Sequence, residues 1–130
     1  MRILVVDDDA DARELLETAL AQAGAQVSVA ASMREALGRL DASNFDVLLS
    51  DIAMPGGTGY DLVRAVRASP RTAALPAVAL TAYSRNEDRN RALSAGFNFH
   101  LGKPFELAVL IHTLVIAAAH KPGEDRAVVA

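Results

Sequence analysis

Residues 1–12 read MRILVVDDDADA, and the junction within this stretch decides the fold. Four apolar residues, Ile3–Val6, run directly into three aspartates, Asp7–Asp9. A short apolar run without alternating polar residues is typical of a strand that is covered on both faces of a sheet. Clustered carboxylates repel one another, and in a low-dielectric site one of them is forced to hold a proton. The three aspartates therefore indicate open solvent, a helix N-terminus or a bound cation.

Further strand candidates recur along the chain. Val47–Leu49 and Ala77–Leu80 are also apolar and uninterrupted, so we expect them to be buried on both faces. Gln26–Ala30 and Phe97–Leu101 are weaker candidates, and we expect them nearer the edges of the sheet.

Helix signals lie between the strand candidates. Apolar residues recur at helix spacing from Ala12 to Ala23, and Gly24 supplies a stop. The other predicted helices have start signals at a capping box Ser32–Glu35, a capping residue Thr58, a second capping box Ser84–Glu87, and the apolar segment that runs from Phe105 to about His120. The chain therefore reads as a strand followed by a helix, repeated five times.

This alternation predicts an α/β fold with a parallel sheet, helices on both faces and right-handed crossovers. Five such units are typical of a single (βα)5 flavodoxin-like three-layer sandwich with strand order 2-1-3-4-5. The length of 130 residues is enough for one domain, which we assign to residues 1–120. Residues 121–130 are interpreted as a C-terminal tail or linker stub.

The composition argues against several classes of protein. The chain carries 13 basic and 16 acidic residues, and the formal charge of −3 argues weakly against direct nucleic-acid binding. It has no cysteine, which excludes disulfides and thiolate metal sites. The longest apolar stretch, Leu107–Ala119, is interrupted by His112 and Thr113 and is too short to span a bilayer. With no signal peptide evident, we expect a soluble, cytoplasmic protein without membrane insertion.

Unusual polar residues collect at the carboxyl ends of the predicted strands. Asp7 and Asp8 follow the first strand, and Asp51 follows the third. Thr81 ends the fourth strand, and Lys103 follows the fifth. Because the carboxyl ends of parallel strands meet at one edge of a sheet, we expect these five side chains to share one shallow pocket.

A divalent cation makes this arrangement tolerable. Oxygen ligands with several retained waters favour Mg²⁺, and the ion keeps the acids ionised. A carboxylate beside Mg²⁺, with an ammonium group and a hydroxyl nearby, is equipped for phosphoryl transfer. The carboxylate attacks phosphorus, while the cations and the hydroxyl stabilise charge on the equatorial oxygens.

Four motifs now carry a family resemblance: VVDDD, DIAMPGGTG, LTAY and KPF, in this order and each after a predicted strand. Together they resemble a response-regulator receiver domain, the phospho-acceptor module of two-component signalling. The resemblance covers about Arg2 to Ala119. The stretch ALTAYSRNEDRNRALSAGFNFHLGKPFE, residues 79–106, is similar to receivers found in hybrid sensor histidine kinases.

The resemblance implies a role for each acidic residue. Asp51 accepts a phosphoryl group from a sensor histidine kinase or a histidine phosphotransfer protein. Asp7, Asp8 and Asp51 hold Mg²⁺ together with the backbone carbonyl of Ala53. The chain is then a phospho-acceptor, which assists its own phosphorylation and dephosphorylation, and not an enzyme in the ordinary sense.

The resemblance also implies a switch. Thr81 moves toward the phosphate, Lys103 pairs with the acceptor carboxylate and then with the phosphate, and the Lys103–Pro104 peptide bond is cis. His100 stands where receivers usually carry Tyr or Phe, an aromatic residue that rotates inward when the threonine moves. Its ring is smaller and can titrate, so this position is a departure from the family pattern.

Two further positions are expected to tune dephosphorylation. Ala53 and Tyr83 lie two residues after the acceptor and after the switch threonine, respectively. Ala53 cannot orient a water molecule, and Tyr83 is placed to cover the phosphate, so we expect slow self-dephosphorylation. The glycines of residues 56–59 lack the ending of a phosphate-binding loop, and we interpret them as loop flexibility.

Other functions stay open at this point. A small haloacid-dehalogenase-like phosphatase would use Asp7 as nucleophile and Asp9 as general acid, although Asp9 alone is typical of a helix N-cap. Such enzymes need a late acidic pair, and none lies at a strand end after Asp88. A flavin or nucleotide binder of the same fold and a receiver-like scaffold without phosphorylation are further alternatives.

The last predicted helix carries apolar residues on more than one stripe, from Leu107 to Ile116. Deep packing against the sheet explains this pattern, and so does a contact surface formed with the fourth helix and the fifth strand. The second interpretation predicts a partner-docking face or a homodimer.

Overall fold

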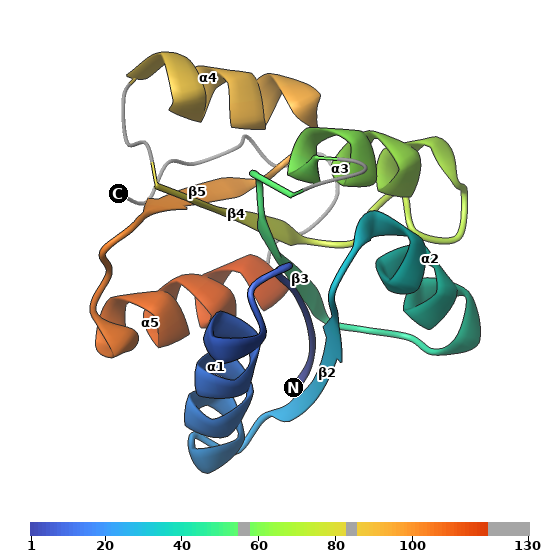
Figure 1. The fold of residues 1–130 in the computed structure, drawn as a ribbon. Helices are drawn as coiled ribbons and strands as arrows, with labels where there is room; N and C mark the ends of the chain where they lie inside the picture. Colours follow the sequence, from blue (N-terminus) through green and yellow to red (C-terminus); the bar gives the residue numbers. More distant parts are fainter. Residues whose placement is uncertain (55–57, 83–85, 120–130) are drawn as a thin grey trace.

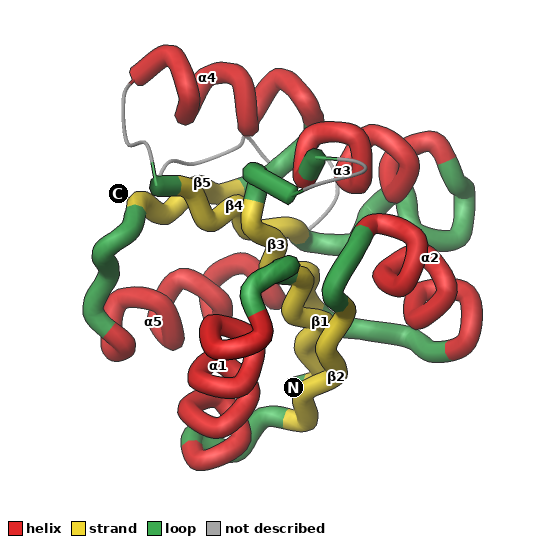
Figure 2. Tube along the Cα trace, viewed as in Figure 1, coloured by secondary structure: helices red, strands yellow, loops and turns green. Residues whose placement is uncertain are grey.

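The computed structural model of the chain describes residues 1–54, 58–82 and 86–119. Strands and helices alternate throughout these ranges (Figures 1 and 2). The strands are β1 (Arg2–Val6), β2 (Gln26–Ala30), β3 (Val47–Asp51), β4 (Ala77–Thr81) and β5 (Phe99–Gly102). The helices are α1 (Ala10–Gln22), α2 (Met33–Ala42), α3 (Gly59–Ala68), α4 (Asn86–Ala95) and α5 (Leu107–Ala118).

The sheet is parallel and has the order β2-β1-β3-β4-β5, which confirms the predicted topology. In the strand register, Val6 of β1 lies opposite Ala30 of β2 on one side and Ser50 of β3 on the other. The weaker strand candidates, β2 and β5, form the two edges as expected. β5 begins at Phe99, two residues later than predicted.

The sheet separates two layers of helices. α1 and α5 cover one face, and α2, α3 and α4 cover the other (Figure 1). β3 and β4 are buried along their whole length because both of their faces contact a core cluster. This double burial is the reason that these strands read as uninterrupted apolar runs.

Helix starts follow the predicted caps with one difference. Asp9 caps α1, because its carboxylate accepts a hydrogen bond from the backbone N–H of Asp11 at 3.0 Å. Ser32 caps α2 by accepting from the N–H of Glu35 at 3.2 Å. The Glu35 carboxylate accepts from the N–H of Ala31, one residue before the cap, so the predicted capping box is only half formed. Part of the predicted Ser84–Glu87 box lies outside the described residues.

Thr58 and Asp61 form a reciprocal capping box at the start of α3. The Thr58 hydroxyl accepts from the N–H of Asp61, and the Asp61 carboxylate accepts from the N–H of Thr58 at 3.0 Å. Hydrogen bonds from the backbone and the hydroxyl of Thr58 hold the pKa of Asp61 below its ordinary value. This box fixes where α3 begins, directly after the segment that follows β3.

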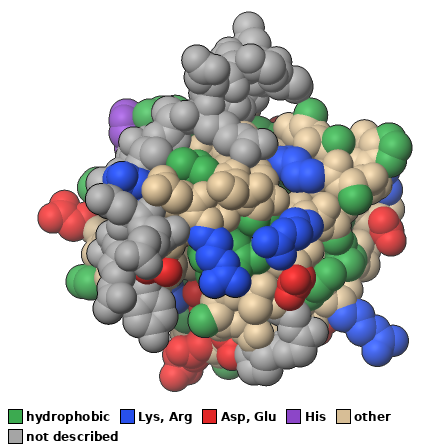
Figure 3. All heavy atoms as spheres, turned by 90° about the horizontal axis from the view of Figure 1, so that it is seen from above, with side chains coloured by type: hydrophobic (Ala, Val, Ile, Leu, Met, Phe, Trp, Pro, Cys, Tyr) green, Lys and Arg blue, Asp and Glu red, His purple; other side chains and the backbone are tan. Residues whose placement is uncertain are grey.

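The surface is mixed in charge. Figure 3 views the molecule from above the orientation of Figure 1, the side on which α3 and α4 lie, and basic and acidic side chains are interspersed on its described part. Among the described residues, none of the helices has both the length and the apolarity that a membrane crossing requires. The predicted tail, residues 121–130, lies outside the described residues.

Replacing Thr58 by alanine is expected to lower the free energy of unfolding by about 1 kcal/mol, because the first turn of α3 loses its capping oxygen. Thr58→Ser keeps that oxygen and should retain most of the stability. Urea unfolding of the three proteins measures the difference. Equal losses in both variants would mean that the threonine methyl, and not the cap, carries the effect.

Candidate functional site

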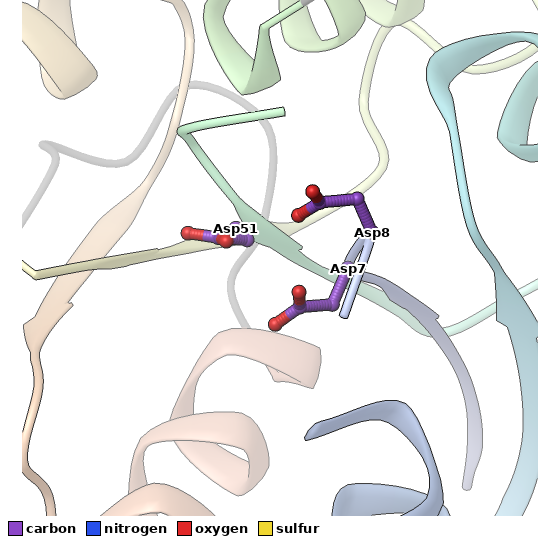
Figure 4. Close-up of side chains that lie close together, drawn as sticks. All are labelled: Asp7, Asp8 and Asp51. Carbon is purple, nitrogen blue, oxygen red and sulfur yellow. The ribbon is translucent and has the colours of Figure 1, made fainter. Parts of the chain in front are cut away.

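Three carboxylates converge at the carboxyl edge of the sheet (Figure 4). Asp51 is the last residue of β3, and Asp7 and Asp8 directly follow β1. One oxygen from each of these residues lies within 4.8 Å of the others. Asp7 and Asp51 are buried, whereas Asp8 is exposed. The predicted meeting of the strand-end acids is therefore confirmed in its geometry.

Asp7 is held by its backbone and by one carboxylate oxygen. Its N–H donates to the carbonyl of Ala30 at 3.1 Å, which continues the pairing of β1 with β2. Its Oδ1 accepts from the N–H of Asp9 at 3.0 Å. The residue is only 2% exposed, and Oδ2 has no hydrogen-bond partner among the described residues.

Lys103 lies between the two buried carboxylates. Its Nζ is 3.7 Å from Oδ2 of Asp7 and 3.7 Å from Oδ1 of Asp51. The residue follows β5, and its N–H donates to the carbonyl of Thr81 at 2.7 Å. The Lys103–Pro104 peptide bond is cis. The Lys103 side chain therefore reaches from the end of β5 past β4 to the acids that lie at the ends of β1 and β3.

Opposing effects act on the pKa of Asp51. Burial raises it, the Lys103 ammonium lowers it, and the Asp7 carboxylate raises it again. Hydrogen bonds from the backbone N–H groups of Ile52 and Ala53 lower it, but the net direction is upward. The site therefore favours additional positive charge close to the Asp51 carboxylate.

The donor set fits a hard divalent cation. All three side chains offer carboxylate oxygens, and Oδ2 of Asp7 is a buried oxygen that lacks a hydrogen-bond donor among the described residues. Exposure of Asp8 leaves one side open to water, which suits Mg²⁺ because this ion keeps several water ligands. The Lys103 ammonium supplies one positive charge beside two of these carboxylates, those of Asp7 and Asp51.

Gly59 packs directly against the end of β3 and the residue that follows it. Its N–H donates to the carbonyl of Ile52 at 2.9 Å, and a Cβ at this position would lie 2.5 Å from the carbonyl oxygen of Asp51. The interpretation of this glycine as part of a flexible loop is wrong, because it is the first residue of α3. A glycine is needed here because any Cβ would clash with the Asp51 carbonyl. The adjacent Thr58 cap is the signal that could have placed it in the helix.

The structure describes three of the other residues that the sequence singled out, which are Thr81, His100 and Ala53. Thr81 ends β4 and is buried, and His100 is a buried residue of β5 that pairs with Ala79. Ala53 is exposed just beyond β3. Tyr83, predicted to tune dephosphorylation, lies outside the described residues.

Sequence reasoning did not identify Arg13 as part of this region. Its guanidinium Nη1 donates to the backbone carbonyl of Asp7 at 2.8 Å. The acceptor is a main-chain atom, so no pairing of residue types in the sequence signals the contact.

An apolar pocket opens beside the acids. It encloses about 410 Å³ between α1 and the segment that joins β5 to α5, and Asp7 and Lys103 line one part of it. Leu15 of α1, 71% exposed, and Leu107 of α5, 45% exposed, also line it. The two leucines therefore add exposed apolar area to the rim of this pocket.

Comparison with known proteins identifies relatives over nearly the whole chain. The family model described as the response regulator receiver domain matches residues 3–115. An uncharacterized 14.6 kDa protein of the sodA1 3′ region in Leptolyngbya boryana is 50% identical over 85% of each chain. The chemotaxis protein CheY of Pseudomonas aeruginosa is 40% identical over 85% of this chain and 90% of its own length. The sensor histidine kinase RcsC of Salmonella typhimurium is 39% identical over 91% of this chain, which spans only 12% of that kinase.

Solved structures give the same result. A putative response regulator from Chloroflexus aurantiacus superposes with a TM-score of 0.87 at 38% identity, covering 92% of this chain and 98% of that one. The receiver domain of the sensor histidine kinase PA1611 from Pseudomonas aeruginosa has a TM-score of 0.84 at 31% identity, with the same coverage of 92% and 98%. That structure has a magnesium ion coordinated in the active-site cleft.

The phosphatase alternative finds no support in these observations. It requires Asp9 as an acid beside Asp7, whereas the Asp9 carboxylate caps α1 and the acidic group consists of Asp7, Asp8 and Asp51. The matched family and the solved structures are receivers.

Replacing Asp51 by asparagine is expected to raise the free energy of unfolding of the metal-free protein at neutral pH. Because the folded state raises the pKa of Asp51, it holds this proton more tightly than the unfolded state, and the ionised carboxylate destabilises the fold. The gain should shrink as the pH falls toward the unfolded-state pKa of about 3.9.

Urea unfolding in EDTA tests this prediction at about pH 7.5, where the Asp51 carboxyl is largely ionised, and at about pH 4, where it is largely protonated in the folded state. Asp41→Asn, at an exposed position of α2, is the charge-matched control. A variant at position 51 that is no more stable than this control at neutral pH would contradict the electrostatic account.

Proposed function

The chain belongs to the response regulator receiver domains of two-component systems, and on this basis we propose that Asp51 accepts a phosphoryl group from phosphohistidine. Receiver domains are phospho-acceptors that interact with histidine kinases or phosphotransfer partners and bind Mg²⁺ at an acidic site. The observation that carries the assignment of Asp51 is its position at the end of β3, between Lys103 and the acids that follow β1.

The transfer step follows from the charges around Asp51. A carboxylate oxygen of Asp51 attacks phosphorus, the P–N bond of the phosphohistidine breaks, and the imidazole nitrogen keeps the electron pair of that bond. The Lys103 ammonium, already close to Asp51, stabilises charge on the phosphoryl oxygens. Asp7, Asp8 and the backbone carbonyl of Ala53 are the proposed further ligands of Mg²⁺. When bound, this ion neutralises the acids and the transferring group.

We propose that Thr81 and His100 report phosphorylation to the surface. Thr81 ends β4 beside the acceptor strand, and His100 is buried on the neighbouring strand β5. If the Thr81 hydroxyl donates to the phosphoryl group, phosphorylation would favour the conformation in which that hydrogen bond forms. The equilibrium between the two conformations then shifts only by the difference in free energy with which they hold the phosphoryl group. Ala53 brings no side chain that orients water, which supports slow loss of the phosphoryl group.

The output surface and the larger context are also proposals. Val115 and Ile116 are exposed apolar residues of α5, which supports a contact face built from α4, β5 and α5. A homodimer through this face, a cytoplasmic location and a tail after residue 120 stay predictions. Both a separate response regulator and a domain of a hybrid kinase are consistent with this role, because relatives of both kinds match the chain.

Treatment with a small phosphodonor and Mg²⁺ is expected to phosphorylate Asp51. Reduction of the acyl phosphate with borohydride, followed by digestion and mass spectrometry, locates the modified residue. Asp51→Asn should lose the modification, whereas Asp41→Asn should keep it. Labelling of Asp7 in the parent protein would contradict the assignment of the acceptor.

The apolar pocket supports a docking position for the phosphodonor protein. A donor must bring its phosphohistidine to Asp51, and the pocket reaches the same site through Asp7 and Lys103. Leu15 and Leu107 offer apolar area at this position. We therefore propose that the kinase or phosphotransfer protein packs apolar residues between α1 and the start of α5.

Leu15→Arg is expected to slow phosphotransfer from the cognate phosphohistidine protein about tenfold or more, which corresponds to roughly 1.4 kcal/mol of lost docking energy. The rate with a small phosphodonor should not change, because the acids are untouched. Val115→Arg, also exposed but outside this pocket, is the control. Transfer that is equally fast in Leu15→Arg and in the control would remove the docking proposal while leaving the assignment of Asp51 intact.

A further inference from the structure

Asp8 differs from the other two acids because its side chain is exposed. The peptide before it presents the carbonyl of Asp7, which accepts from Nη1 of Arg13 at 2.8 Å. The peptide after it presents the N–H of Asp9, which donates to Oδ1 of Asp7 at 3.0 Å. Each of the two peptide groups that flank Asp8 is therefore held by a hydrogen bond, which restrains its backbone.

Arg13 is built into this segment at two points. Its side chain, partly buried, holds the carbonyl of Asp7, and its own N–H donates to the carbonyl of Asp9 at 3.0 Å in the first turn of α1. Asp9 in turn caps the helix through its carboxylate. The capped start of α1 is thus hydrogen-bonded to the segment that carries two of the three acids.

The atom to which Arg13 donates its hydrogen bond matters for cation binding. The hydrogen bond from Nη1 of Arg13 ends on a backbone carbonyl and not on a carboxylate oxygen. Oδ2 of Asp7 consequently stays without a hydrogen-bond donor among the described residues and faces the position between the acids and Lys103. Arg13 stabilises the site without occupying the oxygens that a cation needs.

We propose that Arg13 is a positioning residue, which sets Asp8 for cation binding by fixing the peptide group between Asp7 and Asp8. The inference rests on the proposed Mg²⁺ site and adds a residue to it. Residues that orient metal ligands through hydrogen bonds contribute strongly to affinity, and their loss typically weakens binding by about 10- to 100-fold. Lysine at position 13 keeps the charge and can donate to the Asp7 carbonyl, but its mobile ammonium group holds that carbonyl less precisely than the planar guanidinium does, so it should restore binding only in part.

Calorimetric titration with Mg²⁺, and Mn²⁺ binding followed by electron paramagnetic resonance, measure the effect directly. Arg13→Gln is expected to raise both dissociation constants about tenfold or more, and Arg13→Lys should give an intermediate value. Arg39→Gln on α2 removes the same charge at an exposed position and should bind like the parent. With a small phosphodonor, Arg13→Gln should need more Mg²⁺ for half-maximal phosphorylation but recover at saturating Mg²⁺.

These measurements separate the possible failures. A parent protein that binds neither ion would overturn the metal site, and the role of Arg13 with it. A parent that binds Mg²⁺ while Arg13→Gln matches Arg39→Gln would overturn the role of Arg13 alone. Weaker binding in Arg13→Gln that Arg13→Lys does not improve, with the same loss of unfolding free energy in both, would assign Arg13 a structural role and also reject the proposal.

Discussion

Electrostatic repulsion among three carboxylates is the constraint on which the rest of the site depends. Asp7 and Asp51 are buried close together, and burial and the Asp7 charge both raise the pKa of Asp51. Lys103, which directly follows β5, offsets part of this cost. The fold tolerates the remainder because the acids lie at a sheet edge that is partly open to water, where a cation can enter.

Contacts that involve main-chain atoms hold the segments that carry the acids. Gly59 lets α3 begin in contact with the carbonyl of Asp51, and Arg13 holds the carbonyl of Asp7. The N–H of Asp9 donates to the Asp7 carboxylate, and the Asp9 carboxylate accepts from the first turn of α1. Each contact ends on a main-chain atom or begins from one, so the geometry of the site is set largely by where α1 and α3 start.

The sequence was sufficient for the topology and for the meeting of the acids. Uninterrupted apolar runs appear in β3 and β4 because both faces are buried, and residues that follow parallel strands must lie at the same edge. The Thr58 cap could have placed Gly59 in α3, but its close approach to the Asp51 carbonyl and the contact of Arg13 with the Asp7 carbonyl could not be predicted, because contacts with main-chain atoms leave no pattern of residue types. The start of β5 was predicted two residues too early because Phe97 is apolar and fully buried like a strand residue, although it precedes the strand.

The central claim is that Asp7, Asp8 and Asp51 bind one divalent cation together. Crystals grown with Mn²⁺ and measured at its absorption edge test this claim directly, because the anomalous signal locates the ion without reference to the protein atoms. We predict one strong peak beside all three acids, within direct or water-mediated coordination distance of carboxylate oxygens of Asp7, Asp8 and Asp51. A map without a peak at this edge of the sheet, or with the ion bound by Asp8 alone at the surface, would contradict it.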